Sequence, residues 1–171
     1  MKILLLGYMA SGKSTIGKQL AKKLYLPFID LDDYIIAKEK MEVSTIFKEK
    51  GEIYFRLIEH KYLQEILNSD KDVVLSLGGG TPCYADNIKL ITESNAISIY
   101  LKGSIQLIVE RLKHEKNQRP LVANLEDEKL TEFIAKHLFE RQAFYQQATF
   151  SIPIDNKSLK EIVTEIRVLT H

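Results

Sequence analysis

Cysteine is almost absent from this sequence, since Cys83 is the single one and no disulfide can form within the chain. Disulfides persist mainly in oxidising compartments, so their absence makes the cytoplasm the expected location. A lone thiol is usually a small buried or half-buried side chain, and a catalytic role for Cys83 is the alternative.

Strong net charge and long apolar runs are also missing. The formal net charge is +1, which is too small to attract nucleic acid or a membrane surface. No apolar run approaches the roughly 20 residues that a membrane helix requires. The first residues enter an apolar strand pattern directly, without a signal-peptide pattern. We therefore expect no nucleic-acid and no membrane partner.

The composition that remains is that of a globular protein, with 45% hydrophobic and 27% charged residues among 171. This length suits a single domain, residues 1–171. Short apolar segments alternate with helical patterns, as in parallel sheets covered on both faces. The pattern predicts a three-layer α/β/α domain around a five-stranded parallel sheet. The expected strands are 3–6, 28–31, 73–77, 96–101 and 150–154.

Residues 7–14 read Gly-Tyr-Met-Ala-Ser-Gly-Lys-Ser and fit the phosphate-binding pattern G-x-x-x-x-G-K-[ST], between a strand pattern and a helical pattern. Glycines let the backbone approach phosphate oxygens, and the helix N-terminus supplies positive potential. Lys13 can reach the β- and γ-phosphates, while the Ser14 hydroxyl can bind Mg²⁺. We predict a nucleotide site formed by Gly7, Ala10, Ser11, Gly12, Lys13, Ser14 and Thr15.

Two carboxylates, Asp30 and Asp32, stand at the predicted end of the second strand. Ligands of open α/β sheets bind outside such strand ends. One carboxylate can help to hold Mg²⁺, and the other can accept a proton from a substrate hydroxyl. The alternative is that Asp32 or Asp33 caps the following helix.

Two segments exceed what simple crossovers need. Residues 34–68 are expected to be helical, divided at Gly51, and to form a substrate-binding segment. Residues 113–125 are polar, contain Arg119-Pro120, and are expected to form a mobile lid.

A triple-glycine turn, Gly78 to Gly80, and three arginines complete the candidate site. Consecutive glycines suit a backbone that must touch a ligand, although a flexible turn is the alternative. Arg141 shares a predicted helix face with apolar residues and therefore needs an anion, either a ligand or a protein carboxylate. Arg56 could bind an anion or pair with Glu59, three residues further on. Arg119 could stabilise phosphate charge or be a solvated surface residue.

The ordered set of motifs resembles the shikimate kinases, a family of P-loop small-molecule kinases, over essentially the whole chain. The matching motifs are the phosphate loop, Phe28 to Asp32, Gly51-Glu52 with Phe55-Arg56-Glu59, Gly78 to Gly80, Arg119-Pro120-Leu121, and Glu140-Arg141 with Tyr145. Val122 stands where the family usually has leucine, which is a mild apolar change.

The resemblance implies ATP-dependent phosphorylation of the 3-hydroxyl of shikimate and a strand order of 2-3-1-4-5. In that family the residue matching Asp32 binds ring hydroxyls and acts as base. The arginines matching Arg56 and Arg141 hold the substrate carboxylate, which the triple glycine contacts through its backbone. The resemblance also implies Mg²⁺ at Ser14 and Asp30, phosphate at Arg119 and adenine at Arg111.

Three rival functions remain at this stage. A gluconate or nucleoside-monophosphate kinase would share the phosphate loop, although a nucleotide acceptor needs no carboxylate clamp. A GTP-binding switch needs Asn-Lys-x-Asp, and residues 156–159 read Asn-Lys-Ser-Leu. A nucleotide-binding module without turnover would not need Lys13, Asp32 and Arg119 together. We expect a monomer that binds ATP and shikimate.

Overall fold

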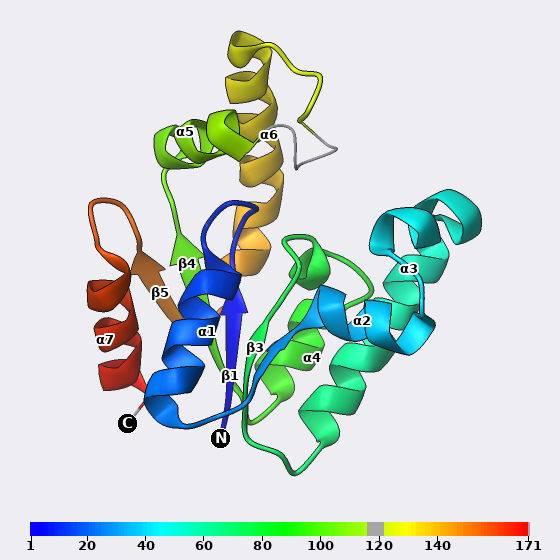
Figure 1. Cartoon of the computed structure of the whole chain (residues 1–171), viewed down its shortest axis with the longest axis vertical. Helices are drawn as coiled ribbons and strands as arrows, with labels where there is room; N and C mark the ends of the chain where they lie inside the picture. The colour runs from blue at the N-terminus through cyan, green and yellow to red at the C-terminus, as the bar shows by residue number, and fades with distance from the viewer. Residues whose placement is uncertain (116–121, 171) are drawn as a thin grey trace.

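The computed structural model describes residues 1–115 and 122–170. At the centre of this part lies a parallel five-stranded sheet in the order β2-β3-β1-β4-β5 (Figure 1). The strands are β1 (Lys2–Leu6), β2 (Phe28–Asp30), β3 (Val73–Ser76), β4 (Ile97–Lys102) and β5 (Phe150–Pro153). The predicted strands and their order are confirmed, with bounds that shift by one residue at most.

Side chains of β1 alternate between two hydrophobic cores. Ile3 and Leu5 pack toward α1 (Lys13–Leu24) and α7 (Leu159–Leu169). Leu4 and Leu6 pack into the core on the opposite face, and all four residues are fully buried. Successive strand residues point to opposite faces, so a continuous apolar run needs helices on both sides. The three-layer arrangement follows from this requirement.

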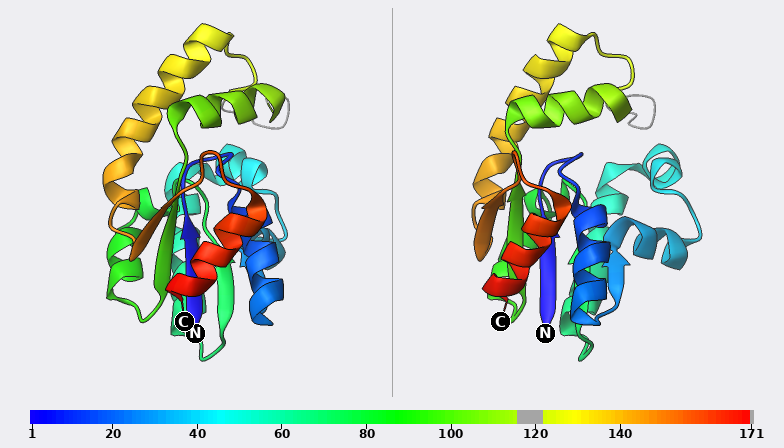
Figure 2. Two further views of the ribbon diagram at one scale, coloured as in Figure 1. Left: turned by 90° about the vertical axis from the view of Figure 1, so that its left-hand side faces the viewer. Right: turned by 60° about the vertical axis from the view of Figure 1, so that its left-hand side comes forward.

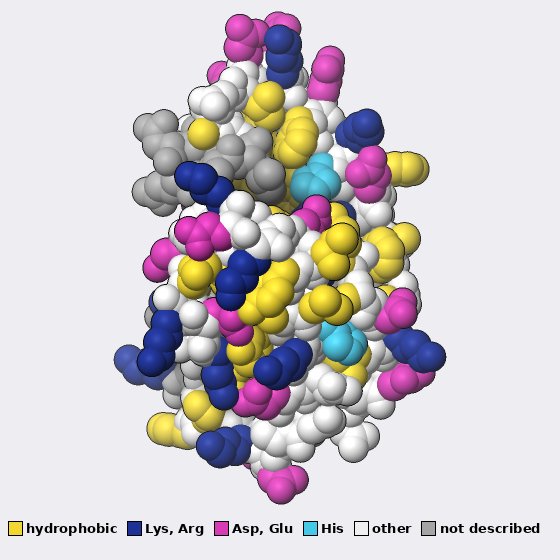
Figure 3. All heavy atoms as spheres, turned by 90° about the vertical axis from the view of Figure 1, so that its right-hand side faces the viewer, with side chains coloured by type: hydrophobic (Ala, Val, Ile, Leu, Met, Phe, Trp, Pro, Cys, Tyr) yellow, Lys and Arg dark blue, Asp and Glu magenta, His cyan; other side chains and the backbone are white. Residues whose placement is uncertain are grey.

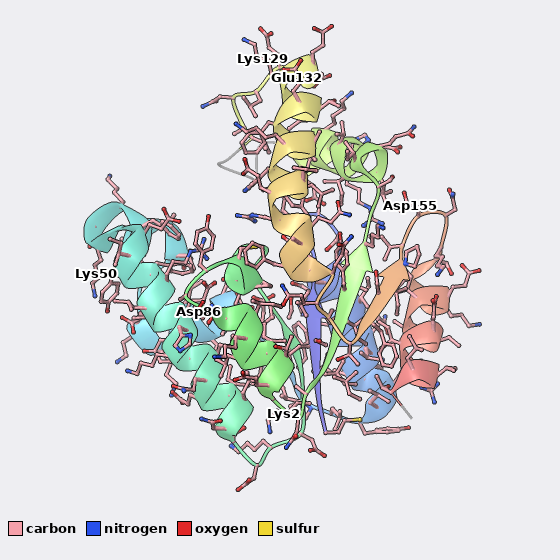
Figure 4. The ribbon with its side chains drawn as sticks, turned by 180° about the vertical axis from the view of Figure 1, so that it is seen from behind. Lys2, Lys50, Asp86, Lys129, Glu132 and Asp155 are labelled. Atoms are coloured by element: carbon pink, nitrogen blue, oxygen red, sulfur yellow. The ribbon has the colours of Figure 1, made fainter. Side chains whose placement is uncertain are left out.

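The second face is covered by α3 (Val43–Asn68), α4 (Asn87–Glu93) and α6 (Asp127–Tyr145), as seen from behind in Figure 4. Helix α5 (Ile105–Glu115) packs against α6. Figure 2 shows both helices rising beyond the carboxyl ends of the strands. The loops that follow β1 and β3, and the start of α2 after β2, lie at this same end of the sheet.

The segment between β2 and β3 begins earlier than its sequence pattern suggests. Helix α2 (Leu31–Glu39) follows β2 without a loop, and α3 starts after a short break. Gly51 has φ 86° and ψ 169°, which interrupts α3 as predicted. Figure 3 views the face on this side, where hydrophobic side chains lie among charged ones. Ile53 and Leu57 of α3 are exposed.

No helix in the described ranges is both long enough and apolar enough to span a bilayer.

Candidate active site

The phosphate loop joins β1 to α1 and has a backbone that its glycines permit. Gly12 has φ 89° and precedes the first residue of α1. Because Gly12 has no side chain, the first N–H groups of α1 have no side-chain cap and stay open to an anion. A Cβ at Gly7 would lie 2.9 Å from the carbonyl oxygen of Leu101 and 2.9 Å from Ser11 Oγ. This loop therefore requires glycine at both positions.

Lys13 folds back along the loop. Its Nζ donates hydrogen bonds to the carbonyl oxygens of Gly7 at 2.7 Å and Tyr8 at 2.9 Å. From α5, Arg111 Nη1 donates to the carbonyl oxygen of Ala10 at 3.0 Å. Ala10 is left-handed, with φ 60°. Two cations from different elements thus lie against one turn of backbone.

Asp30 lies at the junction of β2 and α2 and has two roles there. Its Oδ2 accepts a hydrogen bond from Ser14 Oγ at 2.7 Å, and its Oδ1 accepts one from the Asp32 N–H at 3.0 Å. Asp30 is therefore the cap of α2, whereas the capping alternative named Asp32 or Asp33. The predicted strand 28–31 is one residue too long, because α2 begins at Leu31 and Asp32 occupies its first turn.

Asp32 is held in a negative, poorly solvated place. Burial first, and then the carboxylates of Asp30 and Glu59, raise its pKa to about 6, while Lys13 opposes the rise. A Cβ at Gly78 would lie 3.4 Å from Asp32 Oδ1. The carboxylate therefore lies beside the triple-glycine turn that follows β3.

Arg56 and Arg141 converge on the same turn from α3 and α6. A Cβ at Gly80 would lie 2.8 Å from Arg56 Nη2 and 3.3 Å from Arg141 Nη2. A Cβ at Gly79 would lie 3.3 Å from Arg141 Nη1. The absence of side chains on these glycines thus leaves room for both guanidinium groups.

The guanidinium of Arg56 is fixed on several sides. Nη1 donates to Glu59 Oε1 at 2.8 Å, which confirms the alternative pairing considered for this residue. Glu59 is 1% exposed and also accepts a hydrogen bond from Thr81 Oγ1 at 2.7 Å. Tyr84 covers the guanidinium at 4.0 Å from ring centroid to Cζ. Because Glu59 engages one edge, Nη2 remains directed toward Gly80.

Arg141 lies on the predicted apolar face of α6. Its stripe neighbours Leu130, Ile134, Leu138 and Tyr145 are buried, and Arg141 itself is half-buried. The Tyr145 hydroxyl donates to the carbonyl oxygen of Gly79 at 2.6 Å, which ties α6 to the glycine turn. No carboxylate forms an ion pair with Arg141 within residues 1–115 and 122–170. The part of the chain that the structure describes therefore does not satisfy its charge.

A cleft of about 510 Å³ runs between the phosphate loop and the glycine turn. Its lining includes Asp32 and Arg111, and beyond them Lys157 from the loop after β5 and Leu159 at the start of α7. Residues 156–159, which read Asn-Lys-Ser-Leu, form a turn and the start of α7. Ser158 caps this helix in a capping box with Glu161.

The family model for shikimate kinase matches residues 9–170. The chain belongs to the shikimate kinase family. A curated shikimate kinase of Flavobacterium psychrophilum is 51% identical over 165 residues, which cover 96% of each chain. The membership predicted from the ordered motifs is confirmed, and ATP is the co-substrate of this kinase family.

Two solved structures share the fold closely. A shikimate kinase from Bacteroides thetaiotaomicron is 36% identical, with a TM-score of 0.91 and coverage of 99% of this chain and 98% of its own. A shikimate kinase from Acinetobacter baumannii, in complex with shikimate, is 30% identical, with a TM-score of 0.86 and coverage of 99% and 92%. The rival functions drawn from the phosphate loop alone are therefore set aside.

Two predictions from the sequence reach beyond the described residues. Arg119 lies in the range 116–121, outside the part that the structure describes. The predicted lid, 113–125, shares this range, and its first three residues belong to α5. Both remain predictions.

Four residues contact this shikimate kinase site in ways that the sequence pattern does not predict. Glu59 was considered only as a partner of Arg56, and its burial against Thr81 was not foreseen. Tyr84 and Asn87 contact the site from the turn before α4 and the start of that helix, and Tyr145 contacts it from the end of α6. The motif Glu140-Arg141-x-x-x-Tyr145 was the available signal for Tyr145. Burial raises the pKa of the half-buried Cys83 thiol, which argues against a catalytic nucleophile.

Proposed function

We propose that this kinase transfers the γ-phosphoryl group of ATP to the 3-hydroxyl of shikimate by in-line displacement, with the residues assigned below. The observation that supports this assignment is the convergence of Asp32, Arg56 and Arg141 on the glycine turn next to the phosphate loop. One base and two cations at one turn match a substrate that carries a hydroxyl and a carboxylate.

The nucleotide binds at the loop formed by Gly7, Ala10, Ser11, Gly12, Lys13, Ser14 and Thr15. The open N–H groups at the start of α1 bind phosphate oxygens. The Lys13 ammonium exchanges its contacts with loop carbonyls for the β- and γ-phosphates. Arg111 lies at the adenine side of the cleft, together with the residues after β5. Arg119 is proposed to neutralise phosphate charge from outside the described residues.

The pair Ser14 and Asp30 suits magnesium. A hydroxyl oxygen and a carboxylate oxygen, joined at 2.7 Å, are the hard oxygen ligands that Mg²⁺ prefers. Few protein ligands are expected, because Mg²⁺ usually keeps several waters and binds substrate phosphates. When bound there, Mg²⁺ would supply charge neutralisation at the phosphates. Ser14 and Asp30 would hold the ion, and the cap at Asp30 fixes the carboxylate relative to α2.

The acceptor binds between Asp32 and the two arginines. A pKa near 6 leaves Asp32 ionised at neutral pH yet basic enough to take the hydroxyl proton as transfer proceeds. Arg56 and Arg141 bind the shikimate carboxylate, and the N–H groups of Gly78, Gly79 and Gly80 complete its site. Fixing both ends of the ring aligns the 3-hydroxyl with the γ-phosphate.

The decisive experiment is a substrate panel with ATP, read out as ADP production. Shikimate should be phosphorylated, with gluconate and nucleoside monophosphates near background. Lys13→Ala should nearly abolish turnover while the fold is retained, and phosphate should appear on the 3-hydroxyl by NMR. Phosphorylation elsewhere on the ring, or near-full activity of folded Lys13→Ala, would overturn the assignment.

We also propose that the protein acts as a monomer in the cytoplasm. The near-neutral net charge and single half-buried thiol are compatible with both. Size-exclusion chromatography with light scattering, with and without substrates, tests the first, and cell fractionation tests the second.

A further inference from the structure

Tyr84 covers one face of the Arg56 guanidinium. The distance from its ring centroid to Arg56 Cζ is 4.0 Å, shorter than the corresponding distances of 5.2 Å to Phe55 and 5.9 Å to Phe47. Tyr84 is 38% exposed, whereas Phe55 is buried. Tyr84 is therefore the most exposed of the three rings that contact the guanidinium, since Phe47 is half-buried.

The backbone around Tyr84 is held in a strained shape. Ala85 and Asp86, which follow it directly, are both left-handed, with φ values of 50° and 55°. A left-handed backbone is energetically unfavourable for residues other than glycine, and it persists only when neighbouring contacts impose it. Asp86, labelled in Figure 4, lies at the start of α4 beside α3.

Asn87 supplies those neighbouring contacts. It is fully buried, and its Nδ2 donates to the carbonyl oxygen of Thr81 at 2.9 Å. Its Oδ1 lies 2.7 Å from His60 Nδ1 on α3, and its backbone N–H donates to the Tyr84 carbonyl at 3.0 Å. The turn that carries Tyr84 is thus anchored to the helix that carries Arg56.

We propose that Tyr84 is a positioning residue for the substrate carboxylate, because it fixes the plane of the Arg56 guanidinium so that Nη2 faces Gly80. This inference rests on the role proposed above for Arg56. An aromatic face attracts a guanidinium, and the ring also excludes water from one side of it. Glu59 holds a second edge. Little side-chain freedom is then left for Arg56 to lose when the carboxylate binds.

The first test replaces the ring. Tyr84→Leu should raise KM for shikimate about three- to tenfold, as expected for loss of one cation–π contact, and leave KM for ATP unchanged. Tyr84→Phe keeps the aromatic face and should behave like the wild type. Tyr25→Leu is the matched control, because Tyr25 is 96% exposed at the end of α1. Thermal unfolding verifies that all three variants fold.

The second test asks whether Tyr84 acts through Arg56. Tyr84→Leu should add little to the KM of Arg56→Ala, and it should reduce the affinity penalty for a shikimate amide that lacks the negative charge. An unchanged KM in Tyr84→Leu, an equal loss in Tyr84→Phe, or full additivity with Arg56→Ala overturns the inference alone. An unchanged KM in Arg56→Ala overturns the role of Arg56, and the inference with it.

Discussion

At the scale of single residues, Asp32 is placed where its charged form is disfavoured. Burial and the neighbouring carboxylates of Asp30 and Glu59 raise its pKa from 3.8 to about 6. In the unfolded chain the same carboxyl ionises near its ordinary value. The folded protein therefore binds one proton more tightly than the unfolded chain does. Stability consequently falls as the pH rises from about 4 through about 6.

Asp32→Asn should relieve this cost. At pH 8, in the absence of ligands, the variant should be more stable than the wild type by about 1–3 kcal/mol, since two pKa units correspond to about that much free energy. The difference should vanish below about pH 3, where the Asp32 carboxyl is neutral in both the folded and the unfolded chain. Urea unfolding at the two pH values measures it, and Asp33→Asn, at an exposed neighbour, is the control.

The same Asp32→Asn variant should be nearly inactive, because an amide cannot accept the hydroxyl proton. Loss of a general base costs about 10²- to 10⁴-fold in kcat, with nucleotide affinity little changed. A loss below about tenfold would leave Asp32 a positioning role only. Higher stability together with lower kcat would show that Asp32 serves catalysis at a cost to the stability of the fold.

Gly80→Ala should weaken carboxylate binding by Arg56 and Arg141 without disturbing the fold. Gly80 has φ −85° and ψ −16°, which alanine adopts without strain. The added methyl would lie 2.8 Å from Arg56 and 3.3 Å from Arg141, so both guanidinium groups must move. KM for shikimate should rise about ten- to a hundredfold, as for loss of a charge-assisted hydrogen bond, with KM for ATP nearly unchanged. A substrate titration at saturating ATP measures this, and an unaltered KM would contradict the clamp.

At the scale of elements, the approach of α1 to the sheet depends on one small residue. A Cβ at Gly17 would lie 2.4 Å from the ring of Phe28 and 3.2 Å from Leu5. Gly17→Ala should therefore destabilise the protein by about 1–3 kcal/mol through overpacking, although alanine is the better helix former. Urea unfolding tests this against Gln19→Ala, an exposed position on the same helix. A more stable Gly17→Ala would mean that Phe28 moves away at little cost.

The strands could be predicted because their signal is local. An apolar run such as residues 3–6 has few alternatives to a buried parallel strand. The helix break at Gly51 was likewise predictable from that single glycine. The start of α2 was missed because Phe28 to Leu31 continues an apolar strand pattern. What ends the strand is the hydrogen bond from the Asp32 N–H to the Asp30 carboxylate. Whether the strand continues past Asp30 or Asp30 caps a helix depends on contacts distant in sequence, since the Asp30 carboxylate also accepts a hydrogen bond from Ser14.

Much of the proposed site was also visible in the sequence, because its chemistry requires rare residues at fixed places. Arg141 was identifiable as a charge on an apolar stripe, and the glycines as backbone without side chains. Tyr84 was not, because its contact with Arg56 depends on a turn with two left-handed residues. The burial of Glu59 was equally hidden, since a glutamate on a helix usually faces solvent.

At the scale of the whole molecule, β1 links two cores that other elements complete. Buried tyrosines of the described chain, Tyr8, Tyr62, Tyr100 and Tyr145, all belong to the core on the α3 and α6 side. The chain has no tryptophan, so tyrosine fluorescence includes a signal from that core.

Leu5→Ala, in the opposite core, should still shift the tyrosine-detected unfolding transition. We expect a loss of about 2–5 kcal/mol for Leu5→Ala and for Leu4→Ala, because each side chain is fully buried. Circular dichroism should give the same midpoint as fluorescence for each variant. Separate midpoints would show that the two cores unfold independently.

The place of β1 in the middle of the sheet also matters while the chain is being made. This strand is synthesised before both of its neighbours in the sheet, since Lys2 pairs with Val73 and Ile3 pairs with Ile97. At about 5–20 residues per second, the apolar strand waits roughly five to twenty seconds for its second neighbour. During that time β1 is an unpaired apolar segment of the nascent chain and is prone to aggregate. Synthesis of this kinase thus includes an interval in which a chaperone could bind its N-terminus.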